Sequence, residues 1–334
     1  MRIGIVGAGV QARRRLAAFR PDDRLTAISA LNSGDAARLA ARYRGEAVSS
    51  WLEVVQRDDV DAVIVASPPR SHADIGIAAL RAGKHVLCEK PLAATSEEAA
   101  AMTTAAATAG RVLHCGFNHR LHPAVVRLRE FLASGAFGPV ISAMAVYGHG
   151  IRDGYESEWR CDPACVSGGQ LMEQGIHLVD LVDSMLGPVD RVVAHVGRSC
   201  TLPAGLEDEA HLMLGLSGGG VAMVRSSLTQ WRNRFLLEVT CRKAILRVEG
   251  LGGSYGDETL IIERRTDGPF TTELLEFRGD DQSWRREWQQ FHDLVAASAH
   301  SATADDAGLR SIVIVEAAYR SASSGQWVKI TDGQ

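Results

Sequence analysis

Two short stretches of the chain carry side chains suited to moving protons and stabilising charge. The first is Glu89-Lys90-Pro91, which follows the apolar run 85–88. A carboxylate and an ammonium at the end of a buried strand can bind hydroxyl groups and stabilise negative charge that develops on an oxygen. Because proline disfavours the helical conformation of the preceding residue, Lys90 is expected to be extended, with a fixed direction. The alternative is an ordinary surface ion pair, which contributes little energy.

The second stretch is 168–187, in which Glu173 and His177 stand four residues apart. If a helix has begun by Glu173, both side chains leave the same face and can converge on one small molecule. If the helix begins at Gly175, Glu173 is instead an acid at the helix N-terminus. Apolar residues at 178–185 have a helical period that ends at Gly187. Asp180 is placed either to orient the imidazole or to pack at the helix surface.

A glycine-rich turn opens the chain. Gly7-Ala8-Gly9-Val10-Gln11-Ala12 follows the apolar run 3–6 and precedes a helical pattern. Gly7 permits a tight turn, Gly9 lets the backbone approach a pyrophosphate, and Ala12 lets the helix pack close to the strand. The N-terminus of the helix attracts phosphate. In this setting the G-x-G-x-x-A pattern predicts dinucleotide binding.

The end of the second strand (25–29) leaves the choice of dinucleotide open. An NAD site usually has an acid there for the ribose 2′-hydroxyl, but the chain has Asn32 and Ser33 instead. Either side chain can hydrogen-bond a 2′-phosphate, and Arg13 is a possible cationic partner. The expected cofactor is therefore NAD or NADP. The run Arg13-Arg14-Arg15 otherwise predicts a solvated helix face and is too short to indicate nucleic-acid binding.

The elements that must position these residues change in kind along the chain. Up to about residue 120, strands at 3–6, 25–29, 62–66, 85–88 and 112–115 alternate with helices at 36–43, 72–82 and 95–109. Such alternation predicts a doubly wound parallel sheet, with strand ends lining one crevice. After a strand at 140–147, a polar loop and the helix of His177, seven strand patterns follow between 189 and 277, then helices at 283–298 and 305–323. Consecutive strands with short turns predict an open, mainly antiparallel sheet.

Composition excludes several classes of protein. The chain has 334 residues, 46% apolar and 23% charged, with a formal net charge of −4. This length suits two domains, and the charge offers no basic field to nucleic acid or an anionic membrane. No apolar run approaches the roughly 18–20 residues that span a bilayer, and the first residues have the pattern of a strand rather than of a signal peptide, so no secretion signal is expected. Six scattered cysteines favour reduced thiols and a cytoplasmic location, and their spacing does not predict a metal site.

Together the motifs resemble the glucose–fructose oxidoreductase / inositol dehydrogenase / rhizopine-catabolism (Gfo/Idh/MocA) family. The resemblance extends from Met1 nearly to the C-terminus. It implies an N-terminal Rossmann domain at 1–120, onto which helices at about 283–323 pack back, and a substrate-binding and oligomerisation domain at 121–330. The motifs that carry it are Gly7-Ala8-Gly9, Ser67-Pro68-Pro69-x-x-His72, the segment 82–91 containing Glu89-Lys90-Pro91, and Gly116-Phe117-Asn118-His119-Arg120.

The resemblance also implies roles for individual residues. Glu89 would bind the nicotinamide ribose, Lys90 would approach the reacting oxygen, and Asn118 would lie near the nicotinamide. The family has an Asp-x-x-x-His pair at this helix start, so His177 would transfer the proton and Glu173, one methylene longer, would orient the substrate. The expected cofactor-binding residues are Gly7, Ala8, Gly9, Val10, Gln11, Asn32, Ser33, Ser67, Pro68, His72, Glu89, Lys90 and Asn118, and the expected substrate-binding residues are Tyr155, Trp159, Arg160, Glu173 and His177.

The expected activity is hydride transfer between NAD(P) and a hydroxyl or carbonyl group of a sugar, polyol or sugar derivative. In the loop, Tyr155 and Trp159 can stack on a sugar and Arg160 can meet an anionic group, unless all three serve loop packing. A homodimer or homotetramer through the C-terminal sheet is expected. Two alternatives are a redox-neutral glycosidase, lyase or epimerase that restores its cofactor, and a non-enzymatic dinucleotide sensor. Retention of Lys90 and His177 argues against the sensor.

Overall fold

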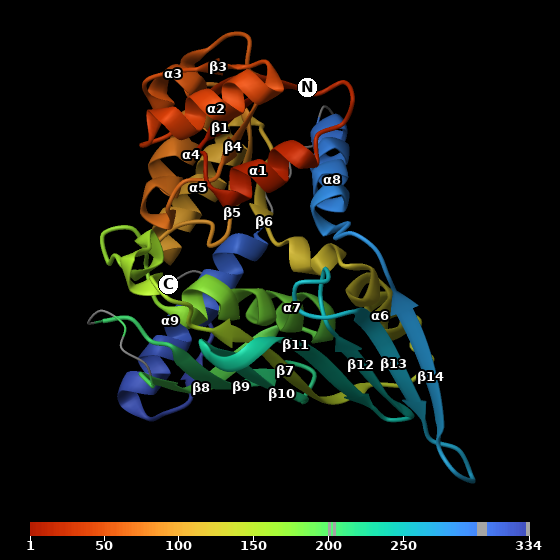
Figure 1. Ribbon diagram of the computed structural model, residues 1–334. Coiled ribbons are helices and arrows are strands. Elements are labelled where there is room, and N and C mark those ends of the chain that lie inside the picture. The colour runs from red at the N-terminus through yellow and green to blue at the C-terminus, as the bar shows by residue number, and fades with distance from the viewer. Residues whose placement is uncertain (200–201, 203–204, 299–305, 332–334) are drawn as a thin grey trace. The chain divides into compact units, whose positions relative to one another are not determined.

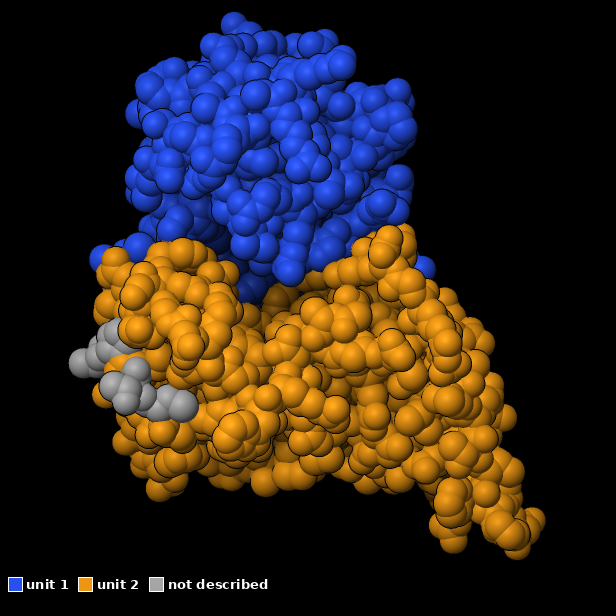
Figure 2. All heavy atoms as spheres, viewed as in Figure 1, with its two compact units in different colours: residues 1–117, 164–167, 284–312 blue, residues 118–163, 168–283, 313–334 orange. Residues whose placement is uncertain are grey.

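The structure is a computed structural model that describes residues 1–199, 202, 205–298 and 306–331. The chain divides into two compact units, which Figure 2 distinguishes by colour. Unit 1 consists of Met1–Phe117, Ala164–Ser167 and Trp284–Ile312, and unit 2 of Asn118–Pro163, Gly168–Ser283 and Val313–Gln334. Both units are therefore built from separate stretches of the chain.

Unit 1 is built on a six-stranded parallel sheet in the order β3-β2-β1-β4-β5-β6. The short apolar runs form its central strands because both faces of a parallel sheet are covered by helices (Figure 1). The doubly wound parallel sheet predicted from the sequence is confirmed. Its strands are β1 (Arg2–Val6), β2 (Arg24–Ser29), β3 (Glu46–Ala47), β4 (Ala62–Val65), β5 (His85–Glu89) and β6 (Leu113–Gly116).

The helices of unit 1 begin at side-chain caps where the sequence supplies them. Asn32, Ser50 and Thr95 each accept a backbone hydrogen bond at the start of a helix. The short elements β3 and α3 were not predicted. The helices that follow the strands are α1 (Val10–Ala17), α2 (Ser33–Tyr43), α3 (Trp51–Gln56), α4 (His72–Arg81) and α5 (Ser96–Ala109).

The prediction that Arg13-Arg14-Arg15 forms a solvated helix face is wrong at its last residue. Arg13 and Arg14 are exposed, whereas Arg15 is fully buried on the side of α1 that faces the protein interior. Arg15 lies three residues after the buried Ala12, and this spacing places both side chains on one helix face. Two buried carboxylates accept hydrogen bonds from its guanidinium and make its burial possible.

A late segment of the chain completes the core of unit 1. Helix α8 (Ser283–Ser298) contributes Trp288 and Phe291, both fully buried, to a cluster that also contains Ile3 and Leu16. The Trp288 ring stacks on Phe19, with ring centroids 5.2 Å apart. The hydrophobic core of unit 1 therefore depends on residues from both ends of the sequence.

Unit 2 is built on a nine-stranded sheet in the order β14-β13-β12-β11-β7-β10-β9-β8-β15. The sheet is antiparallel except between β7 and β10, which run parallel. β7 precedes the other strands of this sheet in the sequence and lies between β10 and β11. This confirms the predicted mainly antiparallel sheet. Its strands are β7 (Val140–Gly150), β8 (Val189–Gly197), β9 (Glu209–Leu216), β10 (Val221–Ser227), β11 (Thr229–Cys241), β12 (Ala244–Glu249), β13 (Glu258–Arg264), β14 (Thr271–Phe277) and β15 (Val328–Lys329).

Helices α6 (Pro123–Ala133) and α7 (Ile176–Leu186) pack on one face of this sheet (Figure 1). Helix α6 was not predicted. Helix α9 (Ala307–Ser324) begins in unit 1 and ends in unit 2. The other sheet face carries exposed apolar side chains, including Met144, Met213 and Met223. Among the described helices, none has the length and hydropathy required to cross a bilayer.

Candidate functional site

The glycine-rich turn of unit 1 has two glycines with different structural needs. Gly7 has φ +107°, and a Cβ there would lie 2.3 Å from the carbonyl oxygen of Ala66, so only glycine fits. A Cβ on Gly9 would meet no atom within 4 Å. Packing within the protein does not require glycine at this second position. The open space over the N-terminus of α1 is what a dinucleotide pyrophosphate would need.

Four strand ends of unit 1 lie next to one another at one edge of the sheet. Gly7 follows β1, Ser67 closely follows β4, Glu89 ends β5 and Gly116 ends β6. Ligands of open α/β sheets bind at this carboxyl edge. The structure thus brings together the glycine turn, Ser67 and the Glu89-Lys90 pair.

His72 connects two of these strand ends. Its Nε2 lies 2.8 Å from the carbonyl oxygen of Ser67, and its Nδ1 lies 2.8 Å from that of Pro91. Burial lowers the pKa of His72 below its ordinary value. Since neutral imidazole has one N–H, it donates to one of the two carbonyls. The Ser67 hydroxyl lies 2.7 Å from that of Ser71. His72 is therefore buried, and it connects the segment after β4 with the segment after β5.

Glu89 and Lys90 are both buried, with 4% and 8% of their surface exposed. This rules out the alternative of an ordinary surface ion pair. Oε1 of Glu89 accepts a hydrogen bond from Nε of Arg15 at 2.7 Å. The bond between Lys90 and Pro91 is cis.

The residues expected near a ribose occupy the start of α2. Oδ1 of Asn32 accepts hydrogen bonds from the backbone amides of Gly34 and Asp35, at 3.0 and 3.3 Å. Asn32 is thus the N-cap of α2, and Ser33 is the first residue of that helix. At the start of α1, Val10 is half exposed and Gln11 accepts a hydrogen bond from the exposed Arg14.

In unit 2, a π-helical turn, Leu171–Gly175, runs directly into α7. Glu173 lies in the π turn and His177 is the second residue of the α-helix. Of the two helix starts left open by the sequence, the structure has the earlier one. Both residues belong to one continuous helical segment, and its change of pitch falls between them. Single π turns inside helices are frequent at functional sites.

Sequence reasoning missed the immediate neighbour of His177. The buried His119 stacks on it, with ring centroids 3.8 Å apart, and the rings of Tyr147 and Phe235 are nearly perpendicular to the His119 ring. His119 follows β6 within the Gly116–Arg120 motif, but nothing in the motif indicates this stack. The imidazole of His177 therefore lies in a largely aromatic wall.

Asp180 forms an ion pair with Arg120. Nε and Nη2 of Arg120 donate to its two carboxylate oxygens at 2.7 and 2.5 Å, and Asp180 is almost fully buried. This bidentate pair fixes α7 to the turn that carries Arg120 and His119. Asn118, in the same turn, donates from Nδ2 to the Ser283 hydroxyl at 2.8 Å.

The three predicted loop residues differ in exposure. Tyr155 is buried against Cys161 and Leu228, and burial raises the pKa of its phenol above its ordinary value. Arg160 donates from Nε to Oε1 of Glu173 at 3.3 Å, and its guanidinium lies 4.4 Å from the ring centroid of the partly exposed Trp159. The structure therefore joins Trp159, Arg160 and Glu173, and it places Tyr155 in the loop's small core.

Glu207 is a second residue that sequence reasoning missed, because it lies at the edge of an ordinary strand pattern. Its carboxylate accepts hydrogen bonds from the backbone amides of Gly169 and Leu171, both at 2.9 Å, and from the Tyr319 hydroxyl at 2.8 Å. A Cβ on Gly169 would lie 2.1 Å from the Glu207 carbonyl oxygen. These contacts fix the start of the π turn that carries Glu173.

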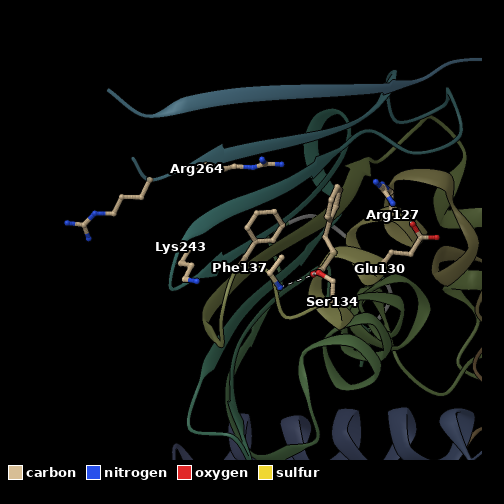
Figure 3. Close-up of a pocket in the computed structure, with 9 residues that line it drawn as sticks. Arg127, Glu130, Ser134, Phe137, Lys243 and Arg264 are labelled. Atoms are coloured by element: carbon tan, nitrogen blue, oxygen red, sulfur yellow. Dashed lines mark hydrogen bonds and ion pairs between the residues drawn. The ribbon is translucent and has the colours of Figure 1, made fainter. Parts of the chain in front are cut away.

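Unit 2 also has a hollow that contains none of the predicted site residues. This cavity of about 530 Å³ lies between the end of α6 and the strand ends at Lys243 and Arg264 (Figure 3). Two of the cations that line it have ordinary partners, since Arg127 pairs with Glu130 at 2.7 Å and Arg264 with Glu273 at 2.9 Å. Within the described chain, no group of three or more His, Cys, Asp or Glu side chains is arranged to hold a metal ion.

Comparison with known proteins accounts for both units. Residues 1–117 match the family described as "Oxidoreductase family, NAD-binding Rossmann fold", and residues 125–247 match the "GFO/IDH/MocA C-terminal domain". Levoglucosan dehydrogenase of Pseudarthrobacter phenanthrenivorans is 28% identical over 68% of this chain and 67% of its own length. D-xylose 1-dehydrogenase (NADP(+)) 2 of Haloferax volcanii is 29% identical over 99% of this chain and 100% of its own. A solved structure of levoglucosan dehydrogenase with NADH and L-sorbose has the same fold, with a TM-score of 0.90, 23% identity and 99% of each chain covered.

Proposed function

The chain belongs to the Gfo/Idh/MocA oxidoreductase family with an NAD-binding Rossmann fold, and from this premise we propose that it is a sugar or polyol dehydrogenase or reductase. Unit 1 binds NAD or NADP, and unit 2 binds the substrate. The supporting observation is that buried Glu89 and Lys90 lie at the same sheet edge as the open glycine turn. The carboxyl edge of a Rossmann sheet that binds only a nucleotide does not require a buried ammonium group next to the nucleotide.

When bound, the nicotinamide accepts or supplies the hydride at the substrate carbon. The residues of the chain handle the proton and the developing charge. His177 takes the proton of the substrate hydroxyl during oxidation and returns it during reduction. Lys90 donates a hydrogen bond to the same oxygen and stabilises its negative charge in the transition state. Glu173 accepts a hydrogen bond from a neighbouring hydroxyl, with Arg160 holding its carboxylate in place.

Carbohydrate-like substrates suit the polar and aromatic groups that line the π turn. The carboxylate of Glu173 and the guanidinium of Arg160 offer an acceptor and a donor to adjacent hydroxyls, and Trp159 offers a ring face. The curated relatives named above act, by their names, on levoglucosan and D-xylose. We take a pyranose or a cyclic polyol as the substrate class.

The test measures nicotinamide absorbance at 340 nm for the purified protein, with NAD and NADP in turn. The panel contains D-xylose, levoglucosan, D-glucose, myo-inositol and a sugar acid, and products are followed in parallel by chromatography. Net formation of reduced cofactor is the expected result. Consumption of a substrate without net reduction would overturn the dehydrogenase assignment in favour of a redox-neutral reaction. Tight cofactor binding with no conversion of any panel compound would also count against it.

Two variants test the assigned roles separately. Lys90→Met is expected to lower kcat by about 100- to 1000-fold, the usual loss when a donor to a developing oxyanion is removed. His177→Asn is expected to lower kcat by about 100-fold or more. His177→Asn should leave the Kd of the cofactor, measured by NADH or NADPH fluorescence, within a few-fold of wild type, and in Lys90→Met the loss in kcat should exceed any rise in that Kd. Arg127→Met, in the separate hollow of Figure 3, is the matched control and should retain full kcat.

We also propose that the open face of the unit 2 sheet mediates a homodimer or homotetramer. Met144 pairs with Met223, and Met223 with Met213, so three exposed side chains form one apolar row across three strands. Such a row on an uncovered sheet face is typical of an interface between copies. Met223→Lys should convert the oligomer to a monomer in sedimentation velocity. A wild-type monomer would refute the proposal.

The five described cysteines form no disulfide, in keeping with a cytoplasmic, reducing location.

A further inference from the structure

Arg15 forms the centre of a buried charge network beneath the cofactor edge of unit 1. Its Nε donates to Oε1 of Glu89 at 2.7 Å, and its Nη1 donates to Oε2 of Glu287. Arg15 is fully buried, and the two carboxylates are 4% and 1% exposed. His114 approaches the other oxygen of Glu287 at 3.7 Å, and the ring of Trp284 lies 4.7 Å from the guanidinium carbon of Arg15. Three separate parts of the sequence therefore meet at one guanidinium.

A guanidinium suits this position better than an ammonium. It is planar and always charged, and its donors point in fixed directions, so it can hold two carboxylates at set angles. A buried carboxylate without a partner is costly, so the pairing with Arg15 offsets the cost of burying the Glu89 carboxylate at the strand end. The attraction of Glu287 and Glu89 raises the pKa of Arg15 despite its burial, so the cation persists at every working pH.

The second oxygen of the Glu89 carboxylate, Oε2, lies near Gly116. A Cβ at Gly116 would lie 3.2 Å from Oε2 of Glu89 and 2.7 Å from Nη2 of Arg15. That Nη2 atom is buried and has no hydrogen-bond partner among the described residues. Because Gly116 ends β6 opposite Glu89 in register, an acceptor and a donor lie together at the carboxyl edge. A ligand hydroxyl, which both donates and accepts, matches this pair.

We infer that Arg15 is a positioning residue for the cofactor site, holding the Glu89 carboxylate in a fixed orientation, and that Glu287 of α8 anchors Arg15. The inference rests on the proposed role of Glu89 in binding the dinucleotide. It makes cofactor affinity depend on a residue from the opposite end of the chain. Glu287 lies 272 positions from Arg15 and is itself buried.

The test is a double-mutant cycle on the full chain, with the Kd of NADH and of NADPH measured by fluorescence titration. Arg15→Met and Glu89→Gln are each expected to raise Kd by about tenfold. The double variant should bind no more weakly than Glu89→Gln alone, because Arg15 acts through that carboxylate. Arg15→Lys should recover less than half of the lost affinity, since an ammonium lacks the planar fork. Arg14→Met, at the exposed neighbouring position on α1, is the control and should bind as wild type.

Steady-state kinetics separate positioning from a general loss of structure. The KM for the cofactor should rise in Arg15→Met and, by about threefold, in Glu287→Gln, while the KM for the sugar stays unchanged. If Arg15→Met does not fold, the cycle of Arg15→Lys with Glu89→Gln provides the same comparison. Additive losses in the cycle, or wild-type cofactor affinity in a folded Arg15 variant, would overturn the inference while leaving the role of Glu89 intact. Wild-type affinity in Glu89→Gln would instead refute the proposed role of Glu89, and the inference with it.

Discussion

The imidazole of His119 lies flat on that of His177, with ring centroids 3.8 Å apart and ring planes inclined by only 14°. The two residues come from different elements of unit 2, the turn after β6 and the helix α7. Arg120, next to His119, is fixed to α7 through its bidentate pair with Asp180. The plane of the His177 ring is therefore set by a neighbour that is itself held to the same helix.

Removing the stacking ring should slow the chemistry without weakening cofactor binding. His119→Ala is expected to lower kcat by about tenfold or more, because a freed imidazole spends less time in the reactive orientation. His119→Phe keeps a flat ring and should retain most of kcat. The measurements are kcat for the best panel substrate and the Kd of NADH and NADPH. Equal kcat for His119→Ala and wild type would show that the stack does not orient His177.

The two glycines of the first turn should respond in opposite ways to one added methyl group. Gly7→Ala places a Cβ 2.3 Å from the carbonyl oxygen of Ala66 at a positive φ, so it should destabilise the fold by about 1–3 kcal/mol. Gly9→Ala has open space around its Cβ and should keep wild-type stability. We expect it to raise the Kd of the dinucleotide at least tenfold. Urea denaturation and fluorescence titration of both variants check this contrast, and tight binding by Gly9→Ala would contradict the pyrophosphate assignment.

Cofactor preference can be tested at Asn32 without disturbing its helix. Asn32→Asp keeps an oxygen that caps α2, because aspartate and asparagine are equally good N-caps. The added negative charge should repel a 2′-phosphate and raise the KM for NADP by about tenfold, while the KM for NAD falls or stays unchanged. An unchanged ratio of the two kcat/KM values would show that the ribose lies elsewhere. Thermal melting of the variant provides the stability control.

Acid should weaken unit 1 through Asp23. Burial alone would raise the pKa of this carboxylate, but hydrogen bonds from the Trp288 indole at 2.7 Å and the Arg20 amide at 2.8 Å hold it below its ordinary value. Because the folded-state pKa is the lower one, the stabilisation is present above about pH 4 and is lost as the pH falls through the folded-state pKa.

Asp23→Asn should therefore lower the free energy of unfolding by about 1–2 kcal/mol at pH 7 and flatten its decline below pH 4. Urea denaturation at pH values from 2.5 to 7 provides the comparison. An acid slope identical to that of wild type would exclude Asp23 as the titrating group. Asp22, exposed beside it, is the matched position for a control substitution.

The sequence predicted the sheet of unit 1 well, because each buried parallel strand is an apolar run bounded by turn residues. It missed β3 and α3, which are two and six residues long and depend on pairing or packing with their neighbours. In unit 2 the strands were recognisable, but their order was not. Local alternation cannot reveal that β7 lies between β10 and β11, since that pairing joins residues about 80 to 100 positions apart.

Motifs in the sequence indicated some residues of the candidate site, whereas residues that join it only through contacts distant in sequence were missed. Glu89, Lys90, Glu173 and His177 stand out as polar residues at strand or helix ends. Arg15 sits in a run of three arginines that has the pattern of a solvated surface, and its partners lie 74 and 272 positions away. His119 and Glu207 act through a ring stack and a backbone cap, and neither has a signature along the chain.

The contribution of α8 to the core of unit 1 also bears on how the protein is made. The last strand of the first sheet ends at Gly116 and α8 begins at Ser283. At about 5–20 residues per second, the ribosome needs roughly ten to thirty seconds to supply that helix. During this interval the nascent chain exposes the apolar surface around Leu16 that Trp288 and Phe291 later cover. This surface would be open to chaperones during synthesis, and a fragment ending near residue 117 is expected to leave it exposed and to aggregate.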